Sequence, residues 1–203
     1  MMNKILFAFL IFSLLLIWSC NNAEREISQP SDSETKKMVS YGDAIVYELV
    51  KTLKTAVKTT IDTAGPVAAI SVCNIEAMPL TKKVKDEAPR DVSIKRTSYQ
   101  FRNPANEPDD LESMALDHYM SLIETGEEIP PFYAQKIVEG EITYYNYYKP
   151  MKMENLCLLC HGDAATIPPN VQAKLHELYP NDKATGYKEG DFRGLIRVRF
   201  NKL

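Results

Sequence analysis

The sequence predicts an α+β domain in which an antiparallel sheet is flanked by helices, with one long helix near the N-terminus. Two observations carry this prediction. Apolar residues recur every four positions in the segment 45–61, which is the spacing of an amphipathic helix. The segments 132–138 and 142–148 are rich in aromatic and β-branched residues around a Glu-Gly pair, as in a β-hairpin. Helices interleaved with hairpin strands are typical of α+β folds.

The chain starts with a segment typical of an export signal. Residues 5–17 carry no charge and follow Lys4. They are too short to span a bilayer, which takes about 20 apolar residues, and fit the apolar core of a signal peptide. Residues 17–20, Ile-Trp-Ser-Cys, resemble a bacterial lipobox, so we expect a signal peptide over 1–19 and a lipid on Cys20. The alternative is an uncleaved N-terminal anchor.

Both interpretations place the folded domain outside the cytoplasm, and we expect a membrane-anchored lipoprotein on the periplasmic side. Residues 20–37 are polar and poor in aromatic residues, which predicts a solvated tether. The folded domain is then expected over 38–203. Its lipid anchor would make the membrane one of its partners.

The first elements of the domain are helices. Gly65 and Pro66 predict the end of the long helix, and a second helix is expected to start at Pro66, because proline is favoured in the first helical turn. A further helical turn is expected at 82–87. The alternating pattern that follows predicts a strand within 91–101.

The Asn- and Pro-rich segment after this strand predicts a loop. Asp109 or Asp110 is expected to cap the next helix, which runs to about Glu124 and turns Met114, among others, inward. The hairpin follows. The remaining elements are expected to be a helix at 153–161, a helix at 169–179 and a strand at 194–200.

The charge balance disfavours one class of partner. The chain has 24 Lys and Arg against 27 Asp and Glu, a formal charge of −3. Proteins that bind nucleic acids need a basic surface, so we expect no nucleic-acid partner.

The motif Cys157-Leu-Leu-Cys160-His161 carries the chemistry of the chain. On a helix, positions i and i+3 share a face, so both thiols can reach the two vinyl groups of one haem, and His161 then points at the iron. This pattern is typical of c-type haem attachment. A dithiol redox pair needs a βαβ context, and a zinc site needs a second Cys/His pair, which His176 alone does not supply.

Cys73 is the one cysteine left without a role if Cys20 is lipidated and the motif binds haem. It is either a small buried hydrophobic residue, as free cysteines often are, or the sixth ligand of the iron. Spacing alone does not choose between Cys73 and the other candidate ligands: Met78, Met114, Met120, Met151, Met153, His118 and His176.

Four motifs in this order resemble one family: SVCNIEAMP, RTSYQFRNPANEPDDLE, CLLCHG and GYKEGDFRGLIRVRF. It is a family of small exported mono-haem c-type proteins with a PAS-like fold, whose domain also forms the sensory front end of membrane signalling proteins. The resemblance spans about residues 40–200. It implies one covalent haem c, with the motif histidine and a cysteine from an early helix as axial ligands. Those positions are His161 and Cys73.

Arg96 and Arg102 are candidate partners of the haem propionates, because a guanidinium matches a carboxylate in shape and charge. The alternative for the loop around Arg102 is that Asn103 and Pro104 shape a turn and nothing more.

These residues favour a sensor over a catalyst. A thiolate ligand favours ferric iron, and two protein ligands leave no open position for a substrate, so we expect no enzyme activity. A redox or small-ligand sensor, in which Cys73 leaves on reduction, fits best, and its signal would pass to a separate, unidentified protein. The alternative is an exported electron-transfer cytochrome. A peroxidase-like enzyme would need a distal acid or base, for which His118 is the candidate.

Overall fold

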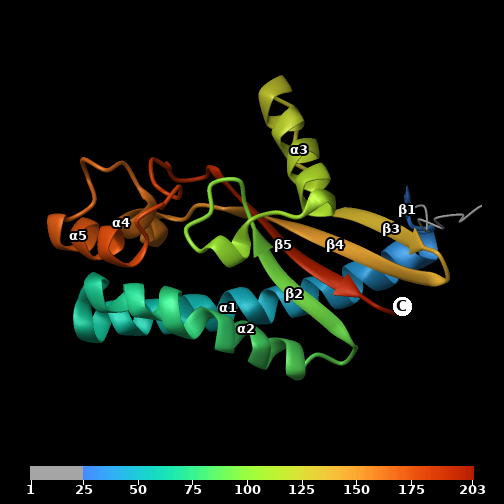
Figure 1. The fold of residues 1–203 in the computed structure, drawn as a ribbon, viewed down its shortest axis with the longest axis horizontal. Coiled ribbons are helices and arrows are strands. Elements are labelled where there is room, and N and C mark those ends of the chain that lie inside the picture. The colour runs from blue at the N-terminus through green and yellow to red at the C-terminus, as the bar shows by residue number, and fades with distance from the viewer. Residues whose placement is uncertain (1–24) are drawn as a thin grey trace, which may run out of the picture.

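The computed structural model describes residues 25–203, so the expected signal peptide and Cys20 lie outside the described residues. The chain forms one antiparallel sheet with helices on both faces (Figure 1). The five strands lie in the order β1-β3-β4-β5-β2. Their bounds are β1 Arg25–Ser28, β2 Val92–Thr97, β3 Tyr133–Glu139, β4 Ile142–Lys152 and β5 Phe192–Phe200. The expected α+β class is confirmed.

One face of the sheet is covered by a helical layer that folds back on itself (Figure 1). Helix α1 (Asp32–Ser71) is broken at Gly65, whose φ of 83° and ψ of 171° are not helical. Proline at the next position disfavours the α conformation of the residue before it, so the break predicted at Gly65 and Pro66 is confirmed. The π-helical segment η1 (Val72–Glu76) and helix α2 (Ala77–Asp86) continue the returning arm.

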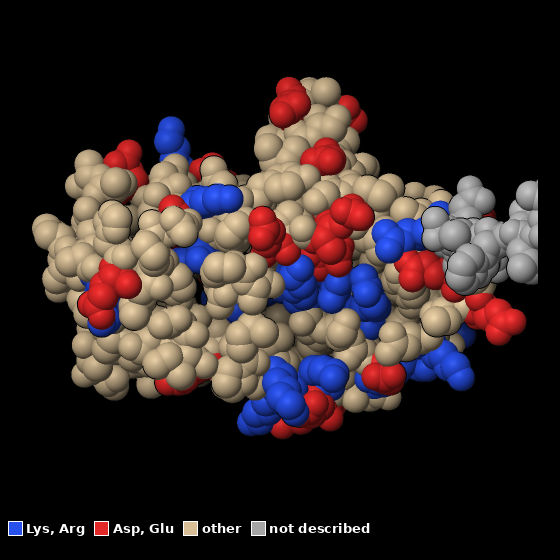
Figure 2. Space-filling model, viewed as in Figure 1, with Lys and Arg blue, Asp and Glu red and all other residues tan. Residues whose placement is uncertain are grey.

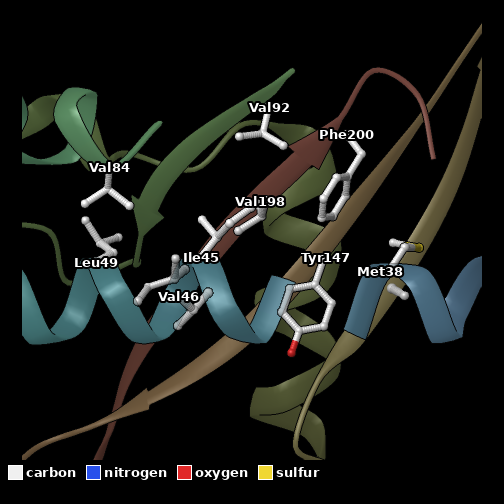
Figure 3. Close-up of a cluster of buried hydrophobic side chains, with 11 residues drawn as sticks. Met38, Ile45, Val46, Leu49, Val84, Val92, Tyr147, Val198 and Phe200 are labelled. Atoms are coloured by element: carbon white, nitrogen blue, oxygen red, sulfur yellow. The ribbon is translucent and has the colours of Figure 1, made fainter. Parts of the chain in front are cut away.

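The main core lies between α1 and the sheet (Figure 3). Met38 and Leu49 of α1 are fully buried, and they belong to one cluster with Tyr147, Val198 and Phe200 of the sheet. Burying side chains of this size contributes about 1.5–3 kcal/mol each. The N-terminal part of the i, i+4 stripe, from Ile45 to Leu53, is therefore the face of α1 that the sheet covers.

The other face of the sheet carries α3 (Asp110–Thr125), which projects from it (Figure 1). Asp109 caps this helix, and its side chain and that of Glu112 form a reciprocal capping box. Ala115, Leu116 and Tyr119 are buried against the sheet. Met114, which was expected to point inward, is 44% exposed. It is exposed because α3 meets the sheet along only one narrow side.

Charges on the face next to α3 are paired. Figure 2 shows basic side chains in the middle of this face with acidic ones directly beside them. Lys95 and Arg197 both form ion pairs with the buried Glu112, at 2.6 and 3.0 Å.

The expected tether of residues 20–37 is wrong from Arg25 onward. Residues 25–28 form β1, which pairs with β3, and α1 already begins at Asp32. Ser31 and Glu34 form a second capping box at that helix start. The folded domain therefore begins at least thirteen residues before Met38. Polar composition was misleading here, because an edge strand and a helix start are held by backbone and capping hydrogen bonds and bury little apolar surface.

The last helices are short. The helix expected at 153–161 is two pieces, η3 (Asn155–Cys157) and α4 (Leu158–His161), because β4 runs to Lys152 and Glu154 is still extended. Helix α5 is Pro169–Leu178, and η2 (Pro104–Asn106) lies in the expected loop. Within residues 25–203, no helix is both long and apolar enough to cross a membrane.

Candidate functional site

The Cys-X-X-Cys-His segment is held in place from outside by one loop. Gly186 donates its backbone N–H to the carbonyl of Gly162 at 2.8 Å, and Tyr187 donates to that of His161 at 3.0 Å. These bonds fix the end of α4, a helix too short to be stable alone. The two cysteines and the histidine therefore occupy a rigid turn.

The imidazole of His161 is oriented by a second contact from the same loop. Its Nδ1 lies 2.6 Å from the carbonyl oxygen of Ala184. A carbonyl only accepts, so Nδ1 carries the proton and Nε2 keeps a free lone pair. Burial, reinforced by the charges of Arg102 and Arg193, holds the pKa of His161 well below its usual value. The ring is therefore neutral and in the tautomer that a metal ligand needs.

All three motif residues line one cavity together with Cys73. This cavity has a volume of about 160 Å³. Apart from these four residues, most of the wall is apolar and comes from α1, η1 and α2, including Val57, Ile61, Ile70, Val72 and Ala77. Charged groups of the wall are Lys54, Arg96, Arg102 and Glu154. A wider hollow of about 650 Å³ adjoins it and shares Cys157 and His161 in its wall. The wider hollow is in the size range of small-molecule and cofactor sites, about 300–1,000 Å³.

Cys73 reaches this cavity from the π-helical segment η1. Single π-helical turns inside helices are rare and often occur at functional sites. Burial raises the pKa of the Cys73 thiol, and the nearby charges of Arg96 and Arg102 oppose that rise. Burial also raises the pKa of Cys160, to about 11. Without a metal, both side chains are therefore neutral thiols at neutral pH.

Arg102 has a structural role that the sequence did not reveal. Its Nε donates to Asp182 at 2.9 Å, and its Nη2 donates to the carbonyl of Cys160 at 2.6 Å. It thereby ties the motif helix to the loop that holds His161. These nitrogens already have protein acceptors, so the Arg102 guanidinium stabilises the position of the motif helix against the loop.

Arg193 is a residue of the site that the sequence did not single out. It lies at the start of β5 and lines the wider hollow with Arg96 and His161. Its guanidinium carbon lies 5.3 Å from the ring centre of Tyr187. The only signal in the sequence was its position within the fourth family motif.

The sequence profile of the Tll0287-like family matches residues 21–201. The chain belongs to the Tll0287-like family. This membership confirms the resemblance inferred from the four motifs. The fold is similar to the crystal structure of the cyanobacterial heme-protein Tll0287, with 21% sequence identity and a TM-score of 0.52. The similarity covers 86% of this chain and 98% of that one. Among curated proteins, no match to this chain is found.

The other candidate ligands are placed differently in this Tll0287-like domain. Met151 and Met153 line the wider hollow, but the smaller cavity that holds Cys73 does not include them. Met78, Met114 and Met120 are exposed. His118 stacks on Tyr133 with ring centres 4.7 Å apart, and His176 is exposed on α5.

The zinc alternative for the cysteine motif lacks support among residues 25–203. In this range Cys73, Cys157 and Cys160 form no disulfide with one another. No cluster of three or more His, Cys, Asp or Glu side chains in this range is arranged to hold a metal ion, as a tetrahedral zinc site requires.

Proposed function

We propose that this protein binds one haem covalently through Cys157 and Cys160 and acts as a redox or small-ligand sensor. His161 and Cys73 are the axial ligands in this proposal. The observation that supports it is that Cys73 lines the same cavity as His161, whose Nε2 keeps a free lone pair for a metal. A relative of the same fold, Tll0287, is a heme-protein.

The donor set fits a haem better than it fits a bare ion. Two thiols on one helical turn suit two thioether bonds, while the imidazole and a third thiol supply one nitrogen and one sulfur ligand. The apolar wall around them suits a porphyrin ring. Haem supplies a redox-active iron with two axial positions, and occupation of both by protein is the reason that we propose no enzyme activity.

Cys73 is the ligand that we expect to respond. A thiolate from Cys73 would stabilise ferric iron, and its hold would weaken on one-electron reduction by an external donor, after which the freed sulfur would take up a proton from solvent. Cys73 lies in η1, within the returning arm of the helical layer, between the end of α1 and the start of α2. Its release would let η1 relax and move α2 against α1, which gives the domain two conformations for a partner protein to distinguish.

We further propose that the domain is exported and held at a membrane by a lipid on Cys20, with its protein partner outside the cytoplasm. The export signal and the lipobox-like residues of the sequence support this location.

The test is a set of three ferric spectra. Wild type, Cys73→Ala and Met153→Leu are made in cells with a cytochrome c maturation system and examined by electron paramagnetic resonance. We expect all three to retain haem after acid–acetone extraction. Wild type and Met153→Leu should show low-spin His/thiolate iron, and Cys73→Ala should be high-spin.

Two outcomes contradict the proposal. A wild-type protein without covalent haem, or a Cys157→Ala/Cys160→Ala variant that still retains it, rejects the attachment. Identical spectra of wild type and Cys73→Ala, with a change in Met153→Leu, favour a methionine ligand and the electron-transfer alternative.

A further inference from the structure

Two arginines beside His161 have no acidic partner. Arg96 of β2 and Arg193 of β5 both line the wider hollow. Among residues 25–203, neither forms an ion pair with a carboxylate, whereas Arg102 pairs with Asp182 at 2.9 Å. The carboxylates in the wall of the wider hollow, Asp43 and Glu154, pair with Lys149 and Lys54 instead. Two positive charges are left uncompensated.

The backbone brings these two arginines together. Strand β2 pairs with β5 so that Thr97 lies opposite Leu195. The residue between Arg193 and Leu195 is Gly194, with φ of 136°, and a Cβ there would lie 2.3 Å from the carbonyl oxygen of Thr97. This close approach, which only glycine permits, places the start of β5 against the end of β2. Burial lowers the pKa of Arg96, and the charge of Arg193 lowers it further.

Arg193 is held without being neutralised. Its guanidinium lies over the ring of Tyr187, and its Nη1 is 3.5 Å from the hydroxyl of that residue. An aromatic face orients a cation but supplies no negative charge to cancel it. Partly buried charges are costly unless they are paired. The pair of arginines therefore suits a ligand with two carboxylates.

We propose that Arg96 and Arg193 bind the two propionate groups of the haem. This inference rests on the haem-binding function proposed above. Each guanidinium can form two parallel hydrogen bonds to a carboxylate. Arg193 takes the place that the sequence had suggested for Arg102, whose Nε and Nη2 are already used by Asp182 and Cys160. Lys149 lines the same hollow but pairs with Asp43.

The test uses the holoprotein and reads the propionates directly by resonance Raman spectroscopy. The variants are Arg96→Gln and Arg193→Gln. In Arg96→Lys and Arg193→Lys, the positive charge is kept but the two parallel hydrogen bonds of a guanidinium are lost. The matched control is Lys152→Gln, which removes a positive charge from an exposed position of the same hollow. All should keep the covalent haem, because the thioether cysteines are unchanged.

We expect the propionate-bending bands to shift in both Gln variants and to shift less in the Lys variants. Lys152→Gln should leave them as in wild type. Unchanged bands at both arginine positions, or an equal shift in Lys152→Gln, overturn the assignment. If a Gln variant does not accumulate, the Lys variant at that position decides by the same criterion. If wild type carries haem but the propionate bands are unchanged in the arginine variants, only the assignment of the two arginines is rejected. A wild type without haem rejects the proposed function and this inference together.

Discussion

Arg102 and Asp182 form an ion pair of 2.9 Å across 80 residues of sequence, and their side chains are only 8% and 13% exposed. The same guanidinium binds the carbonyl of Cys160, so one side chain connects the motif to the loop that orients His161. The stability of the candidate site and that of the domain are therefore coupled.

We predict that Arg102→Gln lowers the free energy of unfolding by about 3 kcal/mol, because it leaves the carboxylate of Asp182 buried without a cation. Urea denaturation of the holoprotein measures this. The control is Lys174→Gln, which breaks the more exposed ion pair with Glu177 and should cost less than about 1 kcal/mol. If the two substitutions lower the unfolding free energy equally, Arg102 does not stabilise the motif helix against the loop.

Gly42 of α1 lies directly under Tyr147, and a Cβ there would lie 2.5 Å from the Tyr147 ring. We predict that Gly42→Ala destabilises the domain by about 1–3 kcal/mol, because the helix must move away from the sheet to admit one methyl group. Ser40→Ala, at an exposed position of the same helix, should be close to neutral. A lower melting temperature for Gly42→Ala alone is the expected result, and a stabilised Gly42→Ala variant would refute it.

The low pKa of Glu34 predicts that the domain loses stability in acid. Hydrogen bonds from Tyr145 and Lys136 lower its pKa from a usual value near 4.5 to about 2. Because the folded-state pKa is the lower one, the unfolded chain binds more protons in this range. The stabilisation by Glu34 is thus complete above pH 4.5 and is lost as the pH falls towards 2. In Glu34→Gln, unfolding free energy should fall less steeply over this range.

The control for this pH dependence is Glu48→Gln, at an exposed position of the same helix. It should show the wild-type decline. If Glu34→Gln also follows the wild-type curve, the contact of Glu34 with Tyr145 and Lys136 does not contribute to acid stability.

Cys20→Ser tests the anchor. If the lipid on Cys20 is the tether, this variant should move from the membrane fraction to the soluble periplasmic fraction, because serine has no sulfur to form a thioether bond to the lipid. Fractionation followed by immunoblotting measures the distribution. Retention of the variant in the membrane with an intact N-terminus would instead support an uncleaved anchor.

Local features of the sequence determined much of the fold. The break at Gly65 and Pro66, the cap at Asp109 and the hairpin around Gly140 follow from the backbone preferences of single residues. The N-terminal part of the apolar stripe of α1 likewise predicted the helix face that the sheet covers. The cysteine motif is also local, since its three side chains lie within one and a half helical turns.

Tertiary structure alone decided which distant residues share the site. No period or spacing links Cys73 to His161, Arg102 to Asp182 or Arg193 to the hollow, because these contacts depend on how β2, β5 and the helical layer pack. For the same reason, the polar composition of residues 25–37 predicts a tether where the structure has a strand and the start of a helix. Residues 25–28 are ordered by pairing with β3, more than a hundred residues away, and hydrophobicity along the chain does not reveal such a partner.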